Sequence, residues 1–179
     1  MEKPVLFTED TSKLSEFTRE ALNYATLDTC CSSSVSGRVW LDFYLESLDI
    51  KWRGEVRGPL PSNRVFKFGK NGRLPSLGSY MIPVTLAKKE VILEMDVVES
   101  DLPLLLSKKA MKKAQMKIDL AVDTVTAFGN KEKLITTSGG HYCMNLKHIP
   151  EMEGQVSSND VFSVDLLNLT DQEQFKAVE

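Results

Sequence analysis

The alternation of residue types between Val91 and Val98 constrains the fold of this chain more than any other feature of its sequence. Apolar residues occupy the odd-numbered positions from 91 to 97, whereas Glu94 and Asp96 fall on the opposite face of an extended chain. This period of two is typical of a β-strand that is buried on one face. The pattern therefore predicts that the chain folds around a sheet.

Short segments of β-forming residues recur along the chain, with turn-forming residues between them. Further strands are predicted at Phe17–Leu27, Val65–Phe68, Tyr80–Leu86, Ile118–Leu120, Thr124–Phe128, Leu134–Thr136, Tyr142–Leu146 and Val161–Leu166. Pro83 indicates that its strand is an edge strand or carries a bulge. Gly69–Gly72 has the residues of a turn, and 51–63 is expected to be a loop.

Two helices are predicted. Apolar residues spaced three and four apart predict one over Val39–Ile50, and Ser107 is a suitable N-cap for a second over Lys108–Lys117. Many short strands with few helices predict a mainly β domain, in which the sheet closes into a barrel with one or two short helices.

Composition excludes several classes of protein. The 179 residues suit one domain with tails, and the net charge of -3 argues against a strongly basic nucleic-acid binder. No apolar run approaches the roughly 18 residues of a membrane span, and the start at Met1–Pro4 shows no secretory signal. Cys30 and Cys31 are adjacent, so we expect a reducing, cytoplasmic (intracellular) setting rather than a disulfide scaffold.

The segment Ala25–Cys30 contains the strongest candidate for chemistry. An apolar strand leads into Asp28, followed by the hydroxyl of Thr29 and the small residue Cys30. This is the layout of an aspartic-protease active loop, in which two carboxylates share one proton because adjacent like charges do not both ionise easily. One carboxylate activates a water while the other donates to the substrate carbonyl. Taken alone, the three-residue pattern more often marks an ordinary turn.

A longer series of segments gives this pattern more weight. The chain resembles the retropepsin-like aspartic proteases of retrotransposon (Gag-Pol type) polyproteins over about two thirds of its length, from Ala21 to Leu146. The matching segments are, in order, LDTCCSSSVSG (27–37) with Trp40-Leu41, FKFGKNG (66–72), DVVESDLPLLLSKKAMKKA (96–114) with Ile118-Asp119-Leu120, and TSGGHYCMNL (137–146). The series is similar to a transposon branch in which the protease lies upstream of integrase.

The resemblance implies roles for particular positions. Asp28 corresponds to the catalytic aspartate, and Thr29 to the hydroxyl position of the Asp-Thr/Ser-Gly motif. Residues 66–84 correspond to the flap, a hairpin that closes over the substrate, and Gly69 and Gly72 allow its bends.

The resemblance extends to the helix and includes two departures. Leu104–Leu106 corresponds to the apolar strand that precedes a short helix, here Lys108–Gln115. Cys30 stands where the family usually has glycine or alanine, and a side chain there crowds the active loop. Ser107 stands where many retropepsins have glycine.

A second Asp-Thr pair and a cluster of metal-ligating residue types have simpler interpretations. Asp123-Thr124 follows Asp28 too closely for a complete second lobe, so we interpret it as a hairpin turn. His141, Cys143 and His148 lack the fourth ligand of a structural zinc site, so we expect no metal there and a buried Cys143.

Two further patterns are interpreted as structural. The lysines of the second predicted helix form the solvated face of an amphipathic helix rather than an RNA-binding surface; they are Lys108, Lys109, Lys112, Lys113 and Lys117. Ser32–Ser34 lacks a histidine partner motif, so a serine nucleophile is disfavoured.

These observations predict an aspartic endopeptidase that cleaves polyprotein peptide bonds without a metal or organic cofactor. Because one chain offers one credible catalytic aspartate, Asp28, and the chemistry needs two, we expect a homodimer. The expected partners are a second copy and a peptide or polyprotein substrate, with no membrane and no nucleic acid. The alternatives are an inactive transposon-derived fragment that keeps the fold, for binding or with no role, and a nucleic-acid-binding module built on the lysine helix.

The expected organisation places one domain between two tails. Residues 1–16 are a polar tail, 17–146 are the retropepsin-like domain, and 147–179 are a remnant of a polyprotein linker.

Overall fold

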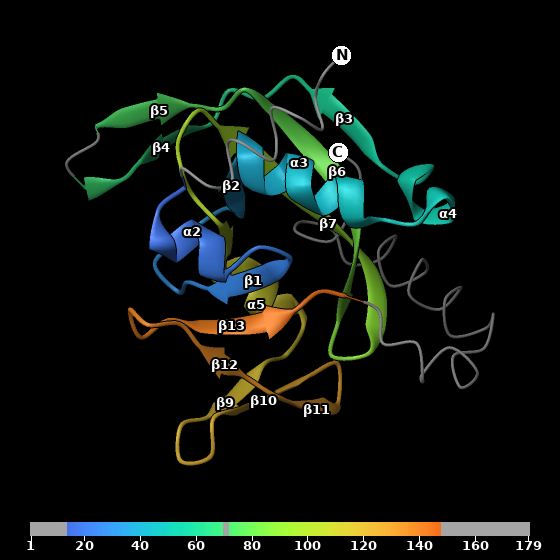
Figure 1. Cartoon of the computed structure of the whole chain (residues 1–179), viewed down its shortest axis with the longest axis vertical. Helices are drawn as coiled ribbons and strands as arrows, with labels where there is room; N and C mark the ends of the chain where they lie inside the picture. The colour runs from blue at the N-terminus through green and yellow to red at the C-terminus, as the bar shows by residue number, and fades with distance from the viewer. Residues whose placement is uncertain (1–13, 70–71, 148–179) are drawn as a thin grey trace.

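A computed structural model describes residues 14–69 and 72–147 of the chain (Figure 1). The strands of this part are β1 (Tyr24–Leu27), β2 (Val35–Gly37), β3 (Arg57–Leu60), β4 (Val65–Lys67), β5 (Arg73–Pro75), β6 (Gly78–Leu86), β7 (Lys89–Val98), β8 (Leu104–Leu106), β9 (Lys117–Asp119), β10 (Thr124–Ala127), β11 (Asn130–Lys133), β12 (Ile135–Thr136) and β13 (Tyr142–Asn145). The helices are α2 (Glu16–Glu20), α3 (Arg38–Ser47), α4 (Ile50–Arg53) and α5 (Lys108–Lys113). The predicted mainly β class is confirmed.

The strands form one large sheet and two small ones. The large sheet has the order β12-β13-β1-β8-β2-β7-β6-β3, and β11-β10-β9 and β4-β5 pair separately. Most neighbours are antiparallel, but β1 runs parallel to β8 and β2 runs parallel to β7. Because β1 and β2 flank β8 in the sheet, the end of β1, the start of β2 and the loop that joins them lie near the middle of the sheet. Closure of the sheet into a barrel remains a prediction.

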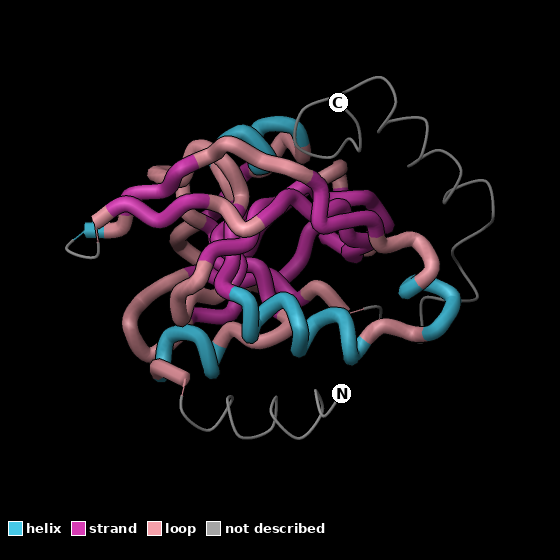
Figure 2. Tube along the Cα trace, turned by 90° about the horizontal axis from the view of Figure 1, so that it is seen from above, coloured by secondary structure: helices cyan, strands magenta, loops and turns pink. Residues whose placement is uncertain are grey.

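The alternation in β7 divides the interior into two apolar clusters. Its odd-numbered residues from Val91 to Val97 join the main core on the side covered by α3. Val98 falls on the other face, in a second cluster that contains Val35, Phe66 and Leu105. In Figure 2, α3 runs along one side of the strands, and the β4–β5 hairpin projects beyond the body of the molecule. The sequence pattern therefore predicted the apolar face of this strand correctly, but Asp96, which was expected on the opposite, polar face, is buried as well.

Helix α3 confirms a helix in the predicted region Val39–Ile50, although it ends at Ser47, and it covers the main core. Trp40 and Tyr44 are buried on its inner face, with their rings stacked 5.3 Å apart. The indole of Trp40 donates to the Ala21 carbonyl at 2.9 Å, and the Tyr44 hydroxyl donates to the Pro83 carbonyl at 2.7 Å. Because both polar atoms have partners, burial of these large rings leaves no unsatisfied donor on them.

Pro83 illustrates why a proline fits into a central strand. β6 pairs with β7 over its whole length, but its pairing with β3 involves only Ser79 and Met81. The Pro83 carbonyl points to the side of Tyr44, where β6 has no strand neighbour at this position. At Pro83, β6 is therefore an edge strand on this side, as predicted. The N–H that proline lacks is not needed for a hydrogen bond to a neighbouring strand there.

Several sequence predictions were wrong in their boundaries. Only Tyr24–Leu27 of the predicted first strand is extended, because the Ser15 side chain caps helix α2 by accepting from the Thr18 N–H. Helix α5 stops at Lys113 rather than Lys117, since Gln115 has a positive φ of 53°.

Other segments were missed or lie outside the described residues. The expected loop 51–63 contains most of α4 and all of β3, and β11 was not predicted. The predicted strand at Val161–Leu166 and most of both predicted tails fall outside the described residues.

Candidate active site

Asp28 lies directly after β1, as the sequence predicted. Its backbone N–H donates to the carbonyl of Leu106 at 3.1 Å, which continues the parallel pairing of β1 with β8 by one residue. The Asp28 side chain is half-buried. The residue is therefore fixed by the sheet at its backbone, while its carboxylate remains accessible.

The Asp28 carboxylate shapes its own loop. Its Oδ1 accepts from the Cys30 N–H at 3.0 Å, and its carbonyl accepts from the Cys31 N–H at 3.1 Å. An aspartate that accepts from the amide two residues later forms an Asx turn, which holds the side chain in one orientation. Thr29 and Cys30 occupy this turn, and both are exposed. The Cys30 side chain is therefore accommodated within a single chain because it points to solvent.

The rest of the loop is tied to the strand–helix junction after β8. The Cys31 carbonyl accepts from the Lys108 N–H, and the Ser34 hydroxyl accepts from the Ser107 N–H, both at 3.0 Å. The Ser107 hydroxyl in turn caps α5 by accepting from the Ala110 N–H at 3.1 Å. This confirms the predicted N-cap. The Ser107 side chain thus caps the helix, while its backbone N–H holds the loop.

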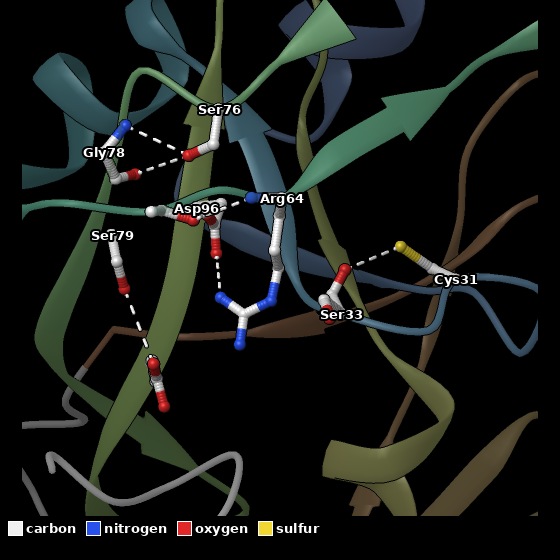
Figure 3. A network of polar contacts seen from close by, with 9 residues as sticks. Cys31, Ser33, Arg64, Ser76, Gly78, Ser79 and Asp96 are labelled. Atoms are coloured by element: carbon white, nitrogen blue, oxygen red, sulfur yellow. Dashed lines mark hydrogen bonds and ion pairs between the residues drawn. The ribbon is translucent and has the colours of Figure 1, made fainter. Parts of the chain in front are cut away.

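Cys31 differs from Cys30 in its surroundings. Its thiol is partly buried and donates to the Ser33 carbonyl at 2.9 Å (Figure 3). Burial, reinforced by the negative charge of Asp28, raises the pKa of the Cys31 thiol to about 11. A thiol that stays protonated is a poor nucleophile and a poor metal ligand. Cys31 is therefore a packing residue of the loop.

The region 66–84, for which a flap is predicted, contains most of the β4–β5 hairpin and the first part of the sheet strand β6. Gly69 and Gly72 have positive φ angles of 48° and 74°, consistent with the predicted turn; residues 70–71 lie outside the described part. Phe66 in β4 and Phe68 just after it stack with their ring centroids 6.1 Å apart. In Figure 1 the hairpin projects toward the side of the molecule at which β1 ends.

The first strand of the hairpin, β4, packs against the candidate active loop. Phe66 is buried in the second cluster with Val35, and Cys31 and Phe68 pack against that cluster. The apolar contact brings together residues more than thirty positions apart in sequence. The hairpin is therefore anchored to the loop that starts at Asp28.

An ion pair with a buried carboxylate, that of Asp96, also lies between the hairpin and the sheet, and no sequence motif pointed to it. The Asp96 carboxylate accepts from the Arg64 guanidinium at 2.7 Å and from the Ser62 hydroxyl at 2.5 Å (Figure 3). Nearby is a groove of about 500 Å³, lined by Leu60, Pro61, Ser62, Asn63, Arg64, Ser79, Met81 and Glu94. In the sequence, the sign of this ion pair was Asp96, an acidic residue within the most regularly alternating predicted strand.

The second Asp-Thr pair lies in a turn, as predicted. Asp123 has a positive φ of 56° and precedes β10, and its carbonyl accepts from the Leu134 N–H at 2.8 Å. Its carboxylate accepts from the Tyr142 hydroxyl at 2.6 Å, which raises the pKa of that phenol. This partner gives the Asp123 carboxylate a structural role.

The prediction of a buried Cys143 is confirmed. Cys143 is fully buried, with its sulfur 3.4 Å from the Thr26 hydroxyl, and His141 contacts the ring of Phe17. His148 lies outside the described residues, and within 14–69 and 72–147 no cluster of three metal-ligating side chains occurs. In α5, Ala110 and Met111 are buried. None of the helices that can be described is long and apolar enough to cross a membrane.

Comparison with known proteins found similarity at the level of the three-dimensional structure. No family model matches the chain, and no curated protein shows significant sequence similarity to it. The structure is similar to the retroviral protease-like domain of Ddi1 from Leishmania major. The two share 19% identity and a TM-score of 0.43, over 64% of this chain and 85% of that domain.

Proposed function

We propose that this chain is the subunit of a homodimeric aspartic endopeptidase of the retropepsin type. The observation that carries the proposal is the placement of Asp28. A sheet-anchored aspartate follows a strand, its carboxylate is held by an Asx turn, and the hairpin packs on its loop. The resemblance of the segments around Asp28, the hairpin and α5 to retropepsin-like proteases supports the same function.

The proposed chemistry uses one Asp28 from each of two subunits. The ionised carboxylate takes a proton from a water, whose oxygen attacks the scissile carbonyl, while the protonated carboxyl donates its proton to the carbonyl oxygen. As the tetrahedral intermediate collapses, the C–N bond breaks and the leaving amine takes the proton that the first carboxylate received from the water. A hydroxyl of the intermediate returns its proton to the second carboxylate as the new carboxyl group forms. The exposure of Thr29 and Cys30 leaves the turn accessible to the corresponding loop of a second subunit. The mechanism needs no metal or organic cofactor.

The proposed substrate is an extended segment of a polyprotein, and the chain itself would belong to a retrotransposon polyprotein. This part of the proposal is supported by the ordered series of resembling segments. An extended peptide lying between the hairpin and the Asp28 loop would place its carbonyl groups along the carboxylates.

The second candidate is an inactive protein that keeps the fold. It is favoured by Cys30, which stands on the exposed turn where the loop of the second subunit would approach. A side chain at this position takes up space that glycine leaves open. Binding of a peptide without cleavage would then be the remaining role.

Cleavage assays with three proteins separate the two candidates. We expect the wild-type chain to cleave a peptide library at mildly acidic pH, with inhibition by pepstatin, and to sediment as a dimer. Asp28→Asn should abolish cleavage while the circular dichroism spectrum stays unchanged. If the wild type is inactive and Cys30→Gly restores cleavage, the inactive-fold candidate is correct. Cleavage that survives in Asp28→Asn contradicts the proposed mechanism.

A further inference from the structure

Asp96 lies at the centre of a polar network that reaches the segment leading into the hairpin. Its side chain is only 1% exposed, although it carries a charge. The Ser62 hydroxyl donates to one carboxylate oxygen and the Arg64 guanidinium donates to the other (Figure 3). Both oxygens of a buried carboxylate are therefore occupied by residues 62–64, which immediately precede β4.

The backbone of the same residue holds the candidate active loop. The Asp96 N–H donates to the Ser34 carbonyl at 3.0 Å, and Asp96 is the register partner of Val35 in the parallel pair of β2 and β7. Ser34 and Val35 end the loop that begins at Asp28. Asp96 therefore contacts the active loop through its backbone and the entry to the hairpin through its side chain.

The geometry makes the position of the hairpin depend on this ion pair. Arg64 is 47% exposed at its side chain, so its guanidinium remains hydrated if the pair separates, whereas Asp96 would be left as a buried, uncompensated charge. Phe66, two residues after Arg64, is buried against Val35. Any movement that separates Arg64 from Asp96 therefore also weakens the packing of Phe66 against Val35.

We propose that Asp96 and Arg64 form a positioning pair that sets the hairpin over Asp28 and thereby controls substrate binding. The inference rests on the proposed function for its kinetic consequence only. The pair touches neither the Asp28 carboxylate nor the water, so its loss should affect the population of the docked hairpin rather than the chemical step. Apparent affinity falls in proportion to the population of the binding-competent state.

Hydrogen exchange tests the structural part of the proposal without any activity. The variants are Arg64→Met, Asp96→Asn and the double variant, which retains no buried charge and therefore remains informative if a single variant unfolds. Arg38→Met is the matched control, since it removes an ion pair of 2.9 Å to Glu99 in which both side chains are exposed.

We expect a localised effect. A two-stranded hairpin is marginal by itself, so exchange at the backbone amides of Val65–Lys67, Arg73 and Leu74 should rise about tenfold in the single variants and stay unchanged in Arg38→Met. The double variant should exchange no faster than Arg64→Met, because the two residues act as one unit. Unchanged hairpin exchange, or an equal rise in β1 and β13, overturns the proposal.

Steady-state kinetics tests the functional part. The KM of Arg64→Met should rise about tenfold while kcat stays within about twofold of the wild type. A lower kcat at unchanged KM contradicts the positioning role. A wild-type chain without any cleavage counts against the proposed function, and the exchange experiment still decides whether the pair docks the hairpin.

Discussion

The backbone N–H of Asp28 donates to the carbonyl of Leu106 across the parallel strands β1 and β8, at 3.1 Å. Leu106 is fully buried in the main core, whereas Asp28 is half-buried at the end of its strand. The two residues are 78 positions apart in sequence (106 minus 28). The candidate catalytic residue is therefore positioned by a core residue that no local pattern connects to it.

Truncation of Leu106 should destabilise the domain. Leu106→Ala removes buried apolar atoms and leaves a cavity beneath the Asp28 loop, so we expect the free energy of unfolding to fall by about 2–5 kcal/mol. Urea denaturation followed by circular dichroism measures this change. Leu120→Ala is the control, because Leu120 is 73% exposed and its loss should change the stability by less than about 0.5 kcal/mol. Equal effects of the two substitutions would contradict the burial assigned to β8.

Gly37 should not tolerate a methyl group. A Cβ atom at Gly37 would overlap the Ser100 carbonyl oxygen and lie 2.9 Å from the Leu102 amide nitrogen, and these backbone atoms have little freedom to move. We expect Gly37→Ala to lower the melting temperature, with a cost of about 1–3 kcal/mol from overpacking.

Gly54→Ala provides the matched control for this position. Both glycines have negative φ angles, and a Cβ at Gly54 would find its nearest neighbour, the Lys51 carbonyl oxygen, at 3.6 Å. The Gly54 variant should therefore melt close to the wild type. A similar loss at both sites would contradict the assigned cause, since a Cβ at Gly54 meets no close backbone atom and the substitution itself restricts the unfolded chain.

Removal of the Tyr44 hydroxyl should reduce stability in a pH-dependent manner. Tyr44→Phe leaves the Pro83 carbonyl without its partner, at a cost of about 1–3 kcal/mol near neutral pH. Burial raises the pKa of the Tyr44 phenol above its ordinary value of 10.0. Above pH 10 the unfolded wild-type chain therefore loses a proton that the folded chain keeps, so this share of the stability is present below pH 10 and lost as the pH rises.

The difference in unfolding free energy between wild type and Tyr44→Phe should accordingly shrink above pH 10. Denaturation curves of both proteins at a series of alkaline pH values measure it, and groups common to the two proteins cancel. A difference that grows with pH would show that the phenol ionises more easily in the folded state, contrary to its burial.

The three cysteines should differ in their reactivity toward a thiol reagent. Cys30 is exposed, Cys31 is partly buried with its pKa raised to about 11, and Cys143 is fully buried. Mass spectrometry after a short exposure to iodoacetamide at pH 8 should therefore find alkylation at Cys30 well before the other two. All three should react at similar rates in denaturant, and rapid labelling of Cys31 in the folded protein would contradict its placement.

Local patterns predicted those parts of the structure in which short-range chemistry dominates. The alternation from Val91 to Val97 identified a strand and its buried face. Apolar residues spaced three and four apart, from Leu41 to Leu48, identified the helix α3. The Ser107 cap was recognisable because capping involves residues three apart. Helix α2 was not predicted at all, because the capping contact at Ser15 starts a helix where the residue pattern indicated the beginning of a strand.

The sequence by itself determined the mainly β class, the strand before Asp28, the turn glycines at Gly69 and Gly72, and the ordered resemblance that assigns Asp28 its proposed role. Only the tertiary structure decided that Leu106 positions Asp28, that Phe66 packs near Cys31, and that Asp96 joins the active loop to the hairpin. The physical reason is that pairing between strands depends on the register of the whole sheet. A residue's partners across the sheet are set by that register rather than by its neighbours in sequence.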